Sequence, residues 1–70
     1  MMPLNLADAG QPQIIKRLGG SQALRQHLAD MGFVPGGAVT VVSTIGGNVI
    51  VKVKESRVAI SREMAQRIMI

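Results

Sequence analysis

The segment from Leu28 to Gly36 constrains the fold of this 70-residue chain more than any other part of the sequence. Gly32 can adopt positive φ without a Cβ clash, which suits the position just past the C-terminal cap of a helix. In such a Schellman arrangement Phe33 folds back onto Leu28. The Pro35-Gly36 pair then supplies the fixed φ and the permissive residue that the centre of a type II turn needs. We therefore expect a helix to end here and a strand to start within two residues.

The residues before this segment have the pattern of an amphipathic helix that begins at Ser21. A serine hydroxyl at this position can accept a hydrogen bond from a free backbone N–H of the first turn. Leu24, Leu28 and Met31 then recur at helical spacing and form one apolar stripe. The sequence therefore predicts one helix that packs this stripe against a core.

Apolar runs on both sides of the helix predict short β-strands. After a lead-in from Met1 to Gly10, which we expect to pack its leucines against the body, the first strand is expected at Gln13–Leu18. Glycines around Ile45-Gly46-Gly47 permit the positive φ of a tight hairpin. The other expected elements are strands at Val39–Thr44 and Asn48–Lys54, a turn at Glu55-Ser56-Arg57, a strand at Val58–Ile60, a helical turn capped by Ser61, and a strand at Arg67–Ile70.

Five short strands and one inserted helix predict a mainly β (α+β) domain. Its core is too small for two layered sheets, so closure into a small barrel is the expected way to bury the strands. We expect a single domain over residues 1–70. A chain of this size buries only about 60% of the surface that its unfolded form exposes, and the absence of cysteine excludes disulfides and thiolate metal sites as stabilising features.

The balance of charged residues favours an anionic partner. Eight Lys and Arg against four Asp and Glu give a formal net charge of +4, although the basic residues are spread over every element. Phe33 is the single aromatic residue, so the stacking platforms typical of single-stranded nucleic-acid binders are missing. No leader-like segment and no apolar run of about 20 residues occurs, which predicts a soluble, unexported protein.

No residue pattern indicates catalysis or a bound cofactor. His27 is the sole histidine, and Asp30 is the nearest further ligand; two ligands without cysteine make a poor metal site. The serines have no nucleophile motif around them. Gly19-Gly20-Ser21 lacks the ending of a nucleotide-binding loop. We therefore expect no catalytic residue, no cofactor and no metal.

A docking patch is the functional feature that the sequence favours. In the expected strand Asn48–Lys54, the residues Ile50, Lys52 and Lys54 alternate with three valines and should share the solvent-facing side. Ile45 lies at the tip of the preceding hairpin. Because small barrels recognise partners through loops and edges, we expect Ile45, Ile50, Lys52 and Lys54 to face outward and bind a partner.

The order of elements, with Leu28–Gly36, Val58–Arg62 and Ala65–Ile68, resembles the FeoA family over nearly the whole chain. The resemblance implies an SH3-like barrel and a small cytoplasmic accessory protein of bacterial ferrous-iron uptake, possessing no enzymatic activity. It also implies that the protein binds the membrane permease FeoB, or the permease's GTP-binding domain, and reaches the inner face of the membrane only through it. The hairpin Ile45–Asn48 departs from the Pro-Leu-Gly-Asp-Pro type of loop common in the family.

Two other functions stay open at this point. The first, also by resemblance, is a regulatory interaction module like the SH3-like domain of metal-dependent repressors, although no helix-turn-helix segment is visible in the sequence. The second is a basic barrel that binds RNA or ribosomes, for which steep loss of binding with salt would be diagnostic. Weak self-association is compatible with each of these functions.

Overall fold

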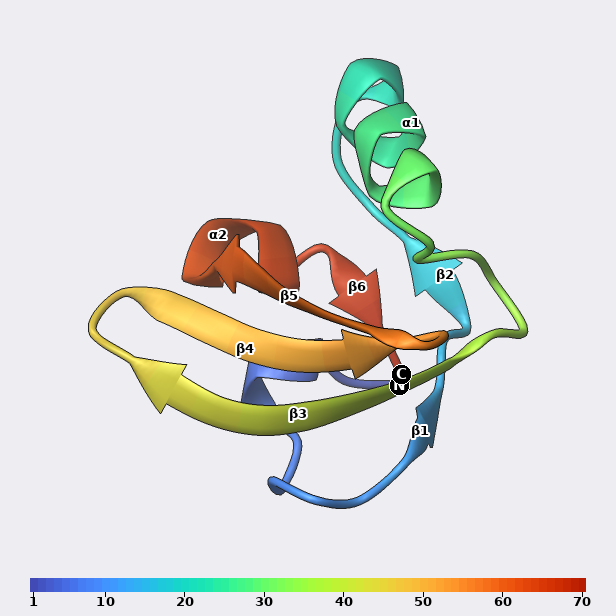
Figure 1. Cartoon of the computed structure of the whole chain (residues 1–70). Helices are drawn as coiled ribbons and strands as arrows, with labels where there is room; N and C mark the ends of the chain where they lie inside the picture. Colours follow the sequence, from blue (N-terminus) through green and yellow to red (C-terminus); the bar gives the residue numbers. More distant parts are fainter.

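The computed structural model describes residues 1–70 and consists of six short strands, two α-helices and one 3-10 helix. Figure 1 labels the helices α1 and α2 and the six strands. In chain order the elements are η1 (Leu4–Leu6), β1 (Gln13–Ile14), β2 (Arg17–Leu18), α1 (Gln22–Asp30), β3 (Ala38–Ile45), β4 (Asn48–Val53), β5 (Ser56–Ser61), α2 (Arg62–Ala65) and β6 (Ile68–Met69).

The strands form two antiparallel sheets that together make the expected small β-rich fold. One sheet has the strand order β1-β3-β4-β5, and the other consists of β2 and β6. The chain ends meet (Figure 1), because Met2 and Ile70 exchange two backbone hydrogen bonds of 2.9 and 2.8 Å. The predicted mainly β fold with one inserted helix is confirmed, and α2 is the helical turn that Ser61 was expected to cap.

The predicted first strand, Gln13–Leu18, is wrong as a single element. Its first half pairs with β3 and its second half pairs with β6, so the chain crosses from one sheet to the other at Ile15. Ile15 is buried and its N–H donates to Gly37, while the next N–H, that of Lys16, donates to Met69. The backbone therefore stays extended and hydrogen-bonded while it changes sheets.

The core lies between the sheets and consists only of hydrophobic side chains. Thirteen residues are buried: Leu4, Ile15, Leu28, Phe33, Val39, Val41, Val49, Val51, Val53, Ile60, Ala65, Ile68 and Ile70. The three valines of β4 are among them, as the alternation of that strand predicts. The lead-in is divided, since Leu4 is buried in η1 but Leu6 is 64% exposed.

The helix ends and the turn after it are confirmed in detail. Ser21 Oγ accepts a hydrogen bond from the N–H of Leu24 at 3.1 Å. At the other end the N–H of Phe33 donates to the C=O of Leu28 at 2.9 Å, and that of Gly32 donates to Ala29 at 3.0 Å, which is the Schellman pattern. Gly32 has a φ of 106°.

The type II turn predicted at Pro35-Gly36 is also present. Gly36 has a φ of 88°, and the N–H of Gly37 donates to the C=O of Val34 at 2.9 Å across the turn. β3 begins at the next residue, Ala38. β3 therefore starts two residues after Gly36, as expected.

The turn predicted at Glu55-Ser56-Arg57 is displaced. β4 ends at Val53, the turn consists of Lys54 and Glu55, and β5 already begins at Ser56. Lys54 therefore lies outside the strand in which the sequence pattern placed it, and it is the only non-glycine residue with positive φ, at 55°. Arg57 lies in β5 rather than in the turn.

Candidate functional site

The solvent-facing side of β3, β4 and β5 carries most of the residues predicted to bind a partner. Strand register aligns them in three rows across the sheet. We call this surface the outer face; its rows are Thr40, Lys52 and Arg57, then Ser43, Ile50 and Ala59, and finally Ile45, Asn48 and Ser61. Because side chains alternate between the two sides of a strand, the valines that lie between these rows fill the core.

The four predicted residues differ in how far they project. Ile45 is 65% exposed at the end of β3, next to the Gly46–Gly47 loop. Ile50 is only half-buried between Ser43 and Ala59, while Lys52 and Lys54 are exposed. A bulge at Val42, where the pairing shifts between Val41 and Ser43, bends β3 beside Ile50. The outer face therefore combines one projecting and one partly covered isoleucine with basic side chains.

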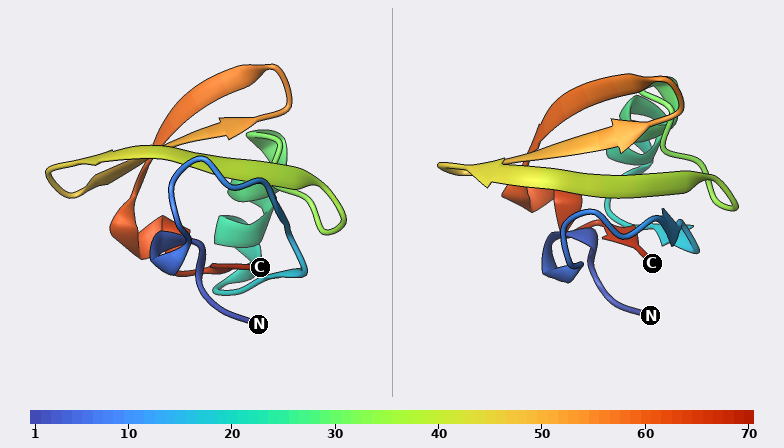
Figure 2. Two further views of the ribbon diagram at one scale, coloured as in Figure 1. Left: turned by 90° about the horizontal axis from the view of Figure 1, so that it is seen from below. Right: turned by 60° about the horizontal axis from the view of Figure 1, so that its bottom comes forward.

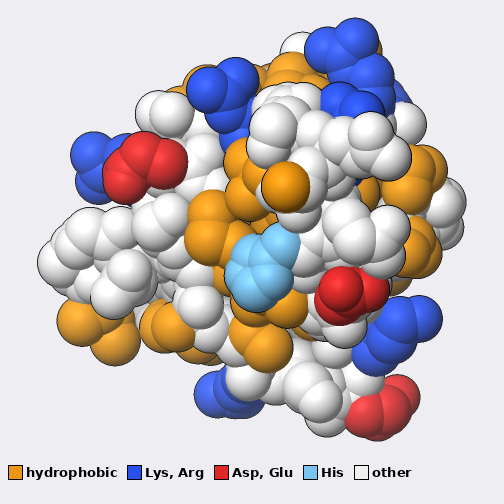
Figure 3. Space-filling model, turned by 90° about the horizontal axis from the view of Figure 1, so that it is seen from above, with side chains coloured by type: hydrophobic (Ala, Val, Ile, Leu, Met, Phe, Trp, Pro, Cys, Tyr) orange, Lys and Arg blue, Asp and Glu red, His pale blue; other side chains and the backbone are white.

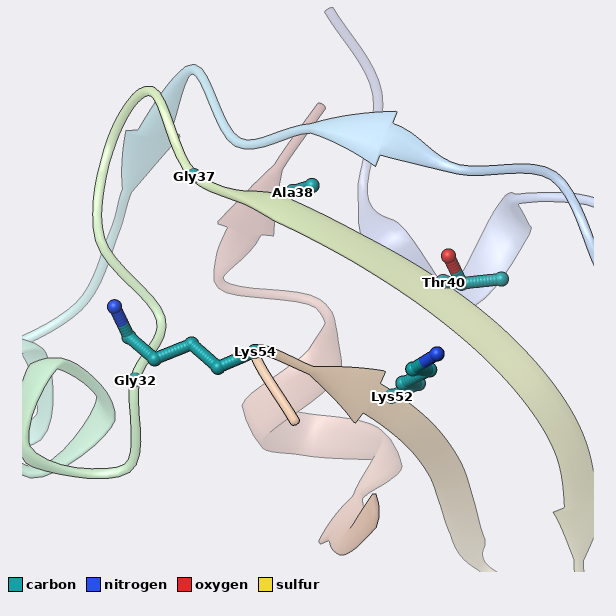
Figure 4. Close-up of a pocket in the computed structure, with 6 residues that line it drawn as sticks. All are labelled: Gly32, Gly37, Ala38, Thr40, Lys52 and Lys54. Atoms are coloured by element: carbon teal, nitrogen blue, oxygen red, sulfur yellow. The ribbon is translucent and has the colours of Figure 1, made fainter. Parts of the chain in front are cut away.

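A shallow pocket of about 300 Å³ lies beside this face. Its lining comes from β3, the end of β4 and the loop after α1: Gly32, Gly37, Ala38, Thr40, Lys52 and Lys54. Figure 4 shows the Lys54 side chain extending over Gly32, whereas Lys52 points toward Thr40. The two ammonium groups do not converge, so the pocket presents a broad positive surface rather than a compact anion site.

Lys52 and Arg57 lie directly opposite each other on β4 and β5. Like charges at opposite positions of neighbouring antiparallel strands are destabilising, and none of the three outer-face rows contains an acidic residue. Arg57 was missed as a candidate because the sequence pattern placed it in a turn. The alternation Ser56, Val58, Ile60 would have placed its side chain on the outer face.

His27 does not belong to a cluster of potential metal ligands. No group of three or more His, Cys, Asp and Glu side chains lies close together. His27 is exposed on α1, and Asp30 accepts a hydrogen bond of 2.9 Å from the side-chain amide of Gln26. Neither helix is long and apolar enough to span a lipid bilayer.

Comparison with known sequences identifies one family. The sequence model of the FeoA domain matches residues 2–70. A protein of Methanocaldococcus jannaschii named "Putative Fe(2+) transport protein A" is 34% identical over 70 residues, which are all of this chain and 85% of that protein.

Solved structures agree in fold. A crystal structure of an iron uptake regulatory protein (FeoA) superposes with a TM-score of 0.86 at 31% identity, covering 96% of this chain and 89% of that one. The solution structure of iron(II) transport protein A from Clostridium thermocellum gives 0.88 at 32% identity, covering 96% of this chain and 43% of that one. The solution structure of a Chlorobium tepidum FeoA protein, at 24% identity, gives 0.87 and covers 97% of this chain and 67% of that one.

Proposed function

The chain belongs to the FeoA family, and we propose that it is a small accessory protein of ferrous-iron uptake, without enzymatic activity, that binds a FeoB-type permease or its GTP-binding domain in the cytoplasm. The names of its relatives, an Fe(2+) transport protein and an iron uptake regulatory protein, support the role in iron uptake. Contact with the membrane would then come through the permease.

The observation that carries the docking role is the composition of the outer face. It places the 65% exposed Ile45 on the same sheet surface as Lys52 and Arg57, with no acidic residue in its three rows. An apolar side chain at a loop end provides contact area, and unpaired positive charge provides attraction to an acidic surface. An acidic patch on the permease or on its GTP-binding domain is therefore the expected counterpart.

The proposal is tested by removing the apolar part of the outer face. Replacing Ile45 and Ile50 together with Ser should reduce capture of the permease from bacterial membranes by at least tenfold, because both side chains would contact the partner. Leu6→Ser is the matched control, since Leu6 is 64% exposed but lies on η1. Circular dichroism checks that both proteins stay folded.

The same variants decide the physiological role. Cells that lack their own copy of the protein should regain ferrous-iron uptake with the parent chain and with Leu6→Ser, but not with the double variant. A folded double variant that restores uptake fully would show that the outer face is not the interface. Membranes that lack the permease give the background of the capture experiment. If the parent protein captures no permease above this background, the proposed partner is refuted.

A further inference from the structure

β5 is an open edge of the four-stranded sheet. It pairs with β4 and with no other strand. In the left panel of Figure 2 it forms the border of the sheet on the side opposite β3. An edge strand presents backbone N–H and C=O groups that can pair with a strand from another chain. At six residues, β5 is also three times as long as β1, the two-residue strand at the opposite edge.

The hydrogen-bond register identifies the unpaired groups. Residues of an antiparallel pair alternate between hydrogen-bonded and non-hydrogen-bonded positions. The N–H of Arg62 donates to the C=O of Gly47 at 3.0 Å, so every second residue back from Arg62 faces β4. Arg57 and Ala59 occupy the other positions, and their N–H and C=O groups point to the free edge. They take part in none of the hydrogen bonds outside the regular elements.

An apolar surface adjoins this edge on the side of the core. Two partly buried side chains that pack against the core lie on or beside this edge, and we call them the apolar seam: Val58 of β5, and Met64 of α2, the helix that contacts β5. Figure 3, which views the molecule from the side of α1, shows hydrophobic side chains above, to the left of and below the only histidine, so this face is partly apolar.

The other side of the edge is basic. Arg57 and Lys52 lie side by side on the outer face, and their mutual repulsion would be relieved by a carboxylate on an added strand. A strand that paired with β5 would thus have a basic surface along one side and the apolar seam along the other. Successive side chains of a strand point to opposite sides, so the two surfaces select for alternating residue types.

We propose that β5 is a docking edge for an extended segment of another protein in which acidic and aliphatic residues alternate. The backbone of this segment pairs with the N–H and C=O groups of Arg57 and Ala59. An acidic residue lies opposite Arg57, and the aliphatic residue opposite Val58 covers the apolar seam. The net charge of +4 disfavours a second copy of this chain as the occupant. The proposal concerns the mode of binding and does not rest on a role in iron uptake.

The test uses the full chain labelled with ¹⁵N and a seven-residue peptide in which valine and glutamate alternate. The peptide should slow amide hydrogen exchange of Arg57 and Ala59 at least tenfold. A matched peptide with lysine in place of glutamate should bind at least tenfold more weakly, because it places like charge opposite Arg57. Neither iron nor the permease is present, so failure here would leave the proposed function unaffected.

Backbone methylation distinguishes strand addition from simple charge attraction. In the added strand the residues opposite Arg57 and Ala59 occupy hydrogen-bonded positions, and these are the glutamates. N-methylation of the glutamate amides should abolish binding, whereas N-methylation of the valine amides, which point away from β5, should leave it within threefold. Equal effects of the two methylated peptides would overturn the proposal.

Two variants test the edge from the protein side. Ala59→Pro removes one edge-facing N–H, a change that edge strands tolerate, and should weaken binding of the glutamate peptide at least tenfold. Ala59→Thr keeps this N–H and should bind the peptide like the parent. If the proline variant does not fold, the methylated peptides still decide the question. Unchanged exchange at Arg57 and Ala59 with the glutamate peptide would refute the proposal. If the amides of Arg57 and Ala59 are protected from hydrogen exchange without peptide, and this protection grows with protein concentration, a second copy of the chain occupies the edge instead.

Discussion

At the scale of single residues, Gly32 determines where α1 ends and how the chain continues. Its φ of 106° lies where a side chain is strained, and the hydrogen bonds from Gly32 and Phe33 close the helix end. This closure directs Phe33 into the core, where both Phe33 and Leu28 are fully buried. One backbone conformation thus links the helix end to the filling of the core.

Gly32→Ala should therefore destabilise the fold by about 1 kcal/mol, the usual cost of forcing an L residue into a left-handed conformation. The added Cβ would lie 3.5 Å from the side chains of Lys54 and Val53, which is ordinary contact, so backbone strain is the only cause. Gly47→Ala is the control, because Gly47 lacks positive φ and has open space around it. Thermal melts that give the two variants equal midpoints would contradict this assignment.

The sequence allowed this residue-scale structure to be predicted because the determinants are local. A Schellman motif and a type II turn depend on residues that are adjacent in the chain, here Gly32 with Phe33 and Pro35 with Gly36. The cap at Ser21 is local in the same way. Lys54 was misplaced because nothing in its side chain favours positive φ, and the hairpin register alone forces this residue into the turn.

At the scale of whole elements, the pairing of β4 with β5 places two positive charges side by side. Lys52 and Arg57 are register partners, and opposite charges at such positions stabilise a sheet whereas like charges destabilise it. The like-charge pair therefore lowers the stability of the free protein, whereas the same charges would strengthen binding of an acidic partner. Stability and binding should respond in opposite directions when one charge is reversed.

Arg57→Glu should raise the free energy of unfolding by about 0.5 kcal/mol, because it converts a like-charge pair into an attractive one. The gain should shrink as salt is added, since surface charges are screened. Binding of the valine–glutamate peptide should fall at the same time. Urea unfolding at low and high salt measures the first effect, with Arg57→Gln as the control that removes charge without reversing it. A loss of stability in Arg57→Glu would mean that Arg57 makes a favourable contact in the free protein.

Helix capping gives a second prediction at this scale. The Ser21 hydroxyl accepts a hydrogen bond from the N–H of Leu24, and Ser21→Ala should cost about 1 kcal/mol because this N–H loses its partner. Ser21→Asp keeps an acceptor and should stay close to the parent. Chemical denaturation measures both changes. A loss confined to the alanine variant would assign it to the cap, whereas equal losses would indicate that the hydroxyl packs rather than caps.

Strand existence was predictable at this scale, but the partners of each strand were not. Periodicity identified β3 and β4, since alternating valines mark the buried side of a strand. The split of Gln13–Leu18 into β1 and β2 depends on which strands lie beside it, and those come from positions 38–39 and 68–69. The free edge at Arg57 and Ala59 escaped prediction for the same reason, because an edge is defined by the order of strands in the sheet.

At the scale of the whole molecule, a single small core holds both sheets and both helices together. Its 13 buried residues come from nearly every element. Phe33 is the largest of the fully buried side chains and the only aromatic one. It enters this core from the loop between α1 and β3, so its removal affects the packing of both elements.

Phe33→Ala should cost about 3–5 kcal/mol, through lost burial and the cavity left behind. A domain of this length has a total stability of about 3–10 kcal/mol at the usual 0.05–0.15 kcal/mol per residue, so this variant should be largely unfolded at 37 °C. Phe33→Leu keeps most of the volume and should remain folded with a lower midpoint. Ile45→Ala, at a 65% exposed position, should change stability by less than about 0.5 kcal/mol. Circular dichroism melts of the three variants measure these effects. A cooperative Phe33→Ala melt with a midpoint near that of the parent would show that the core packs without its aromatic residue. The link between the helix end and the core would then be dispensable for folding.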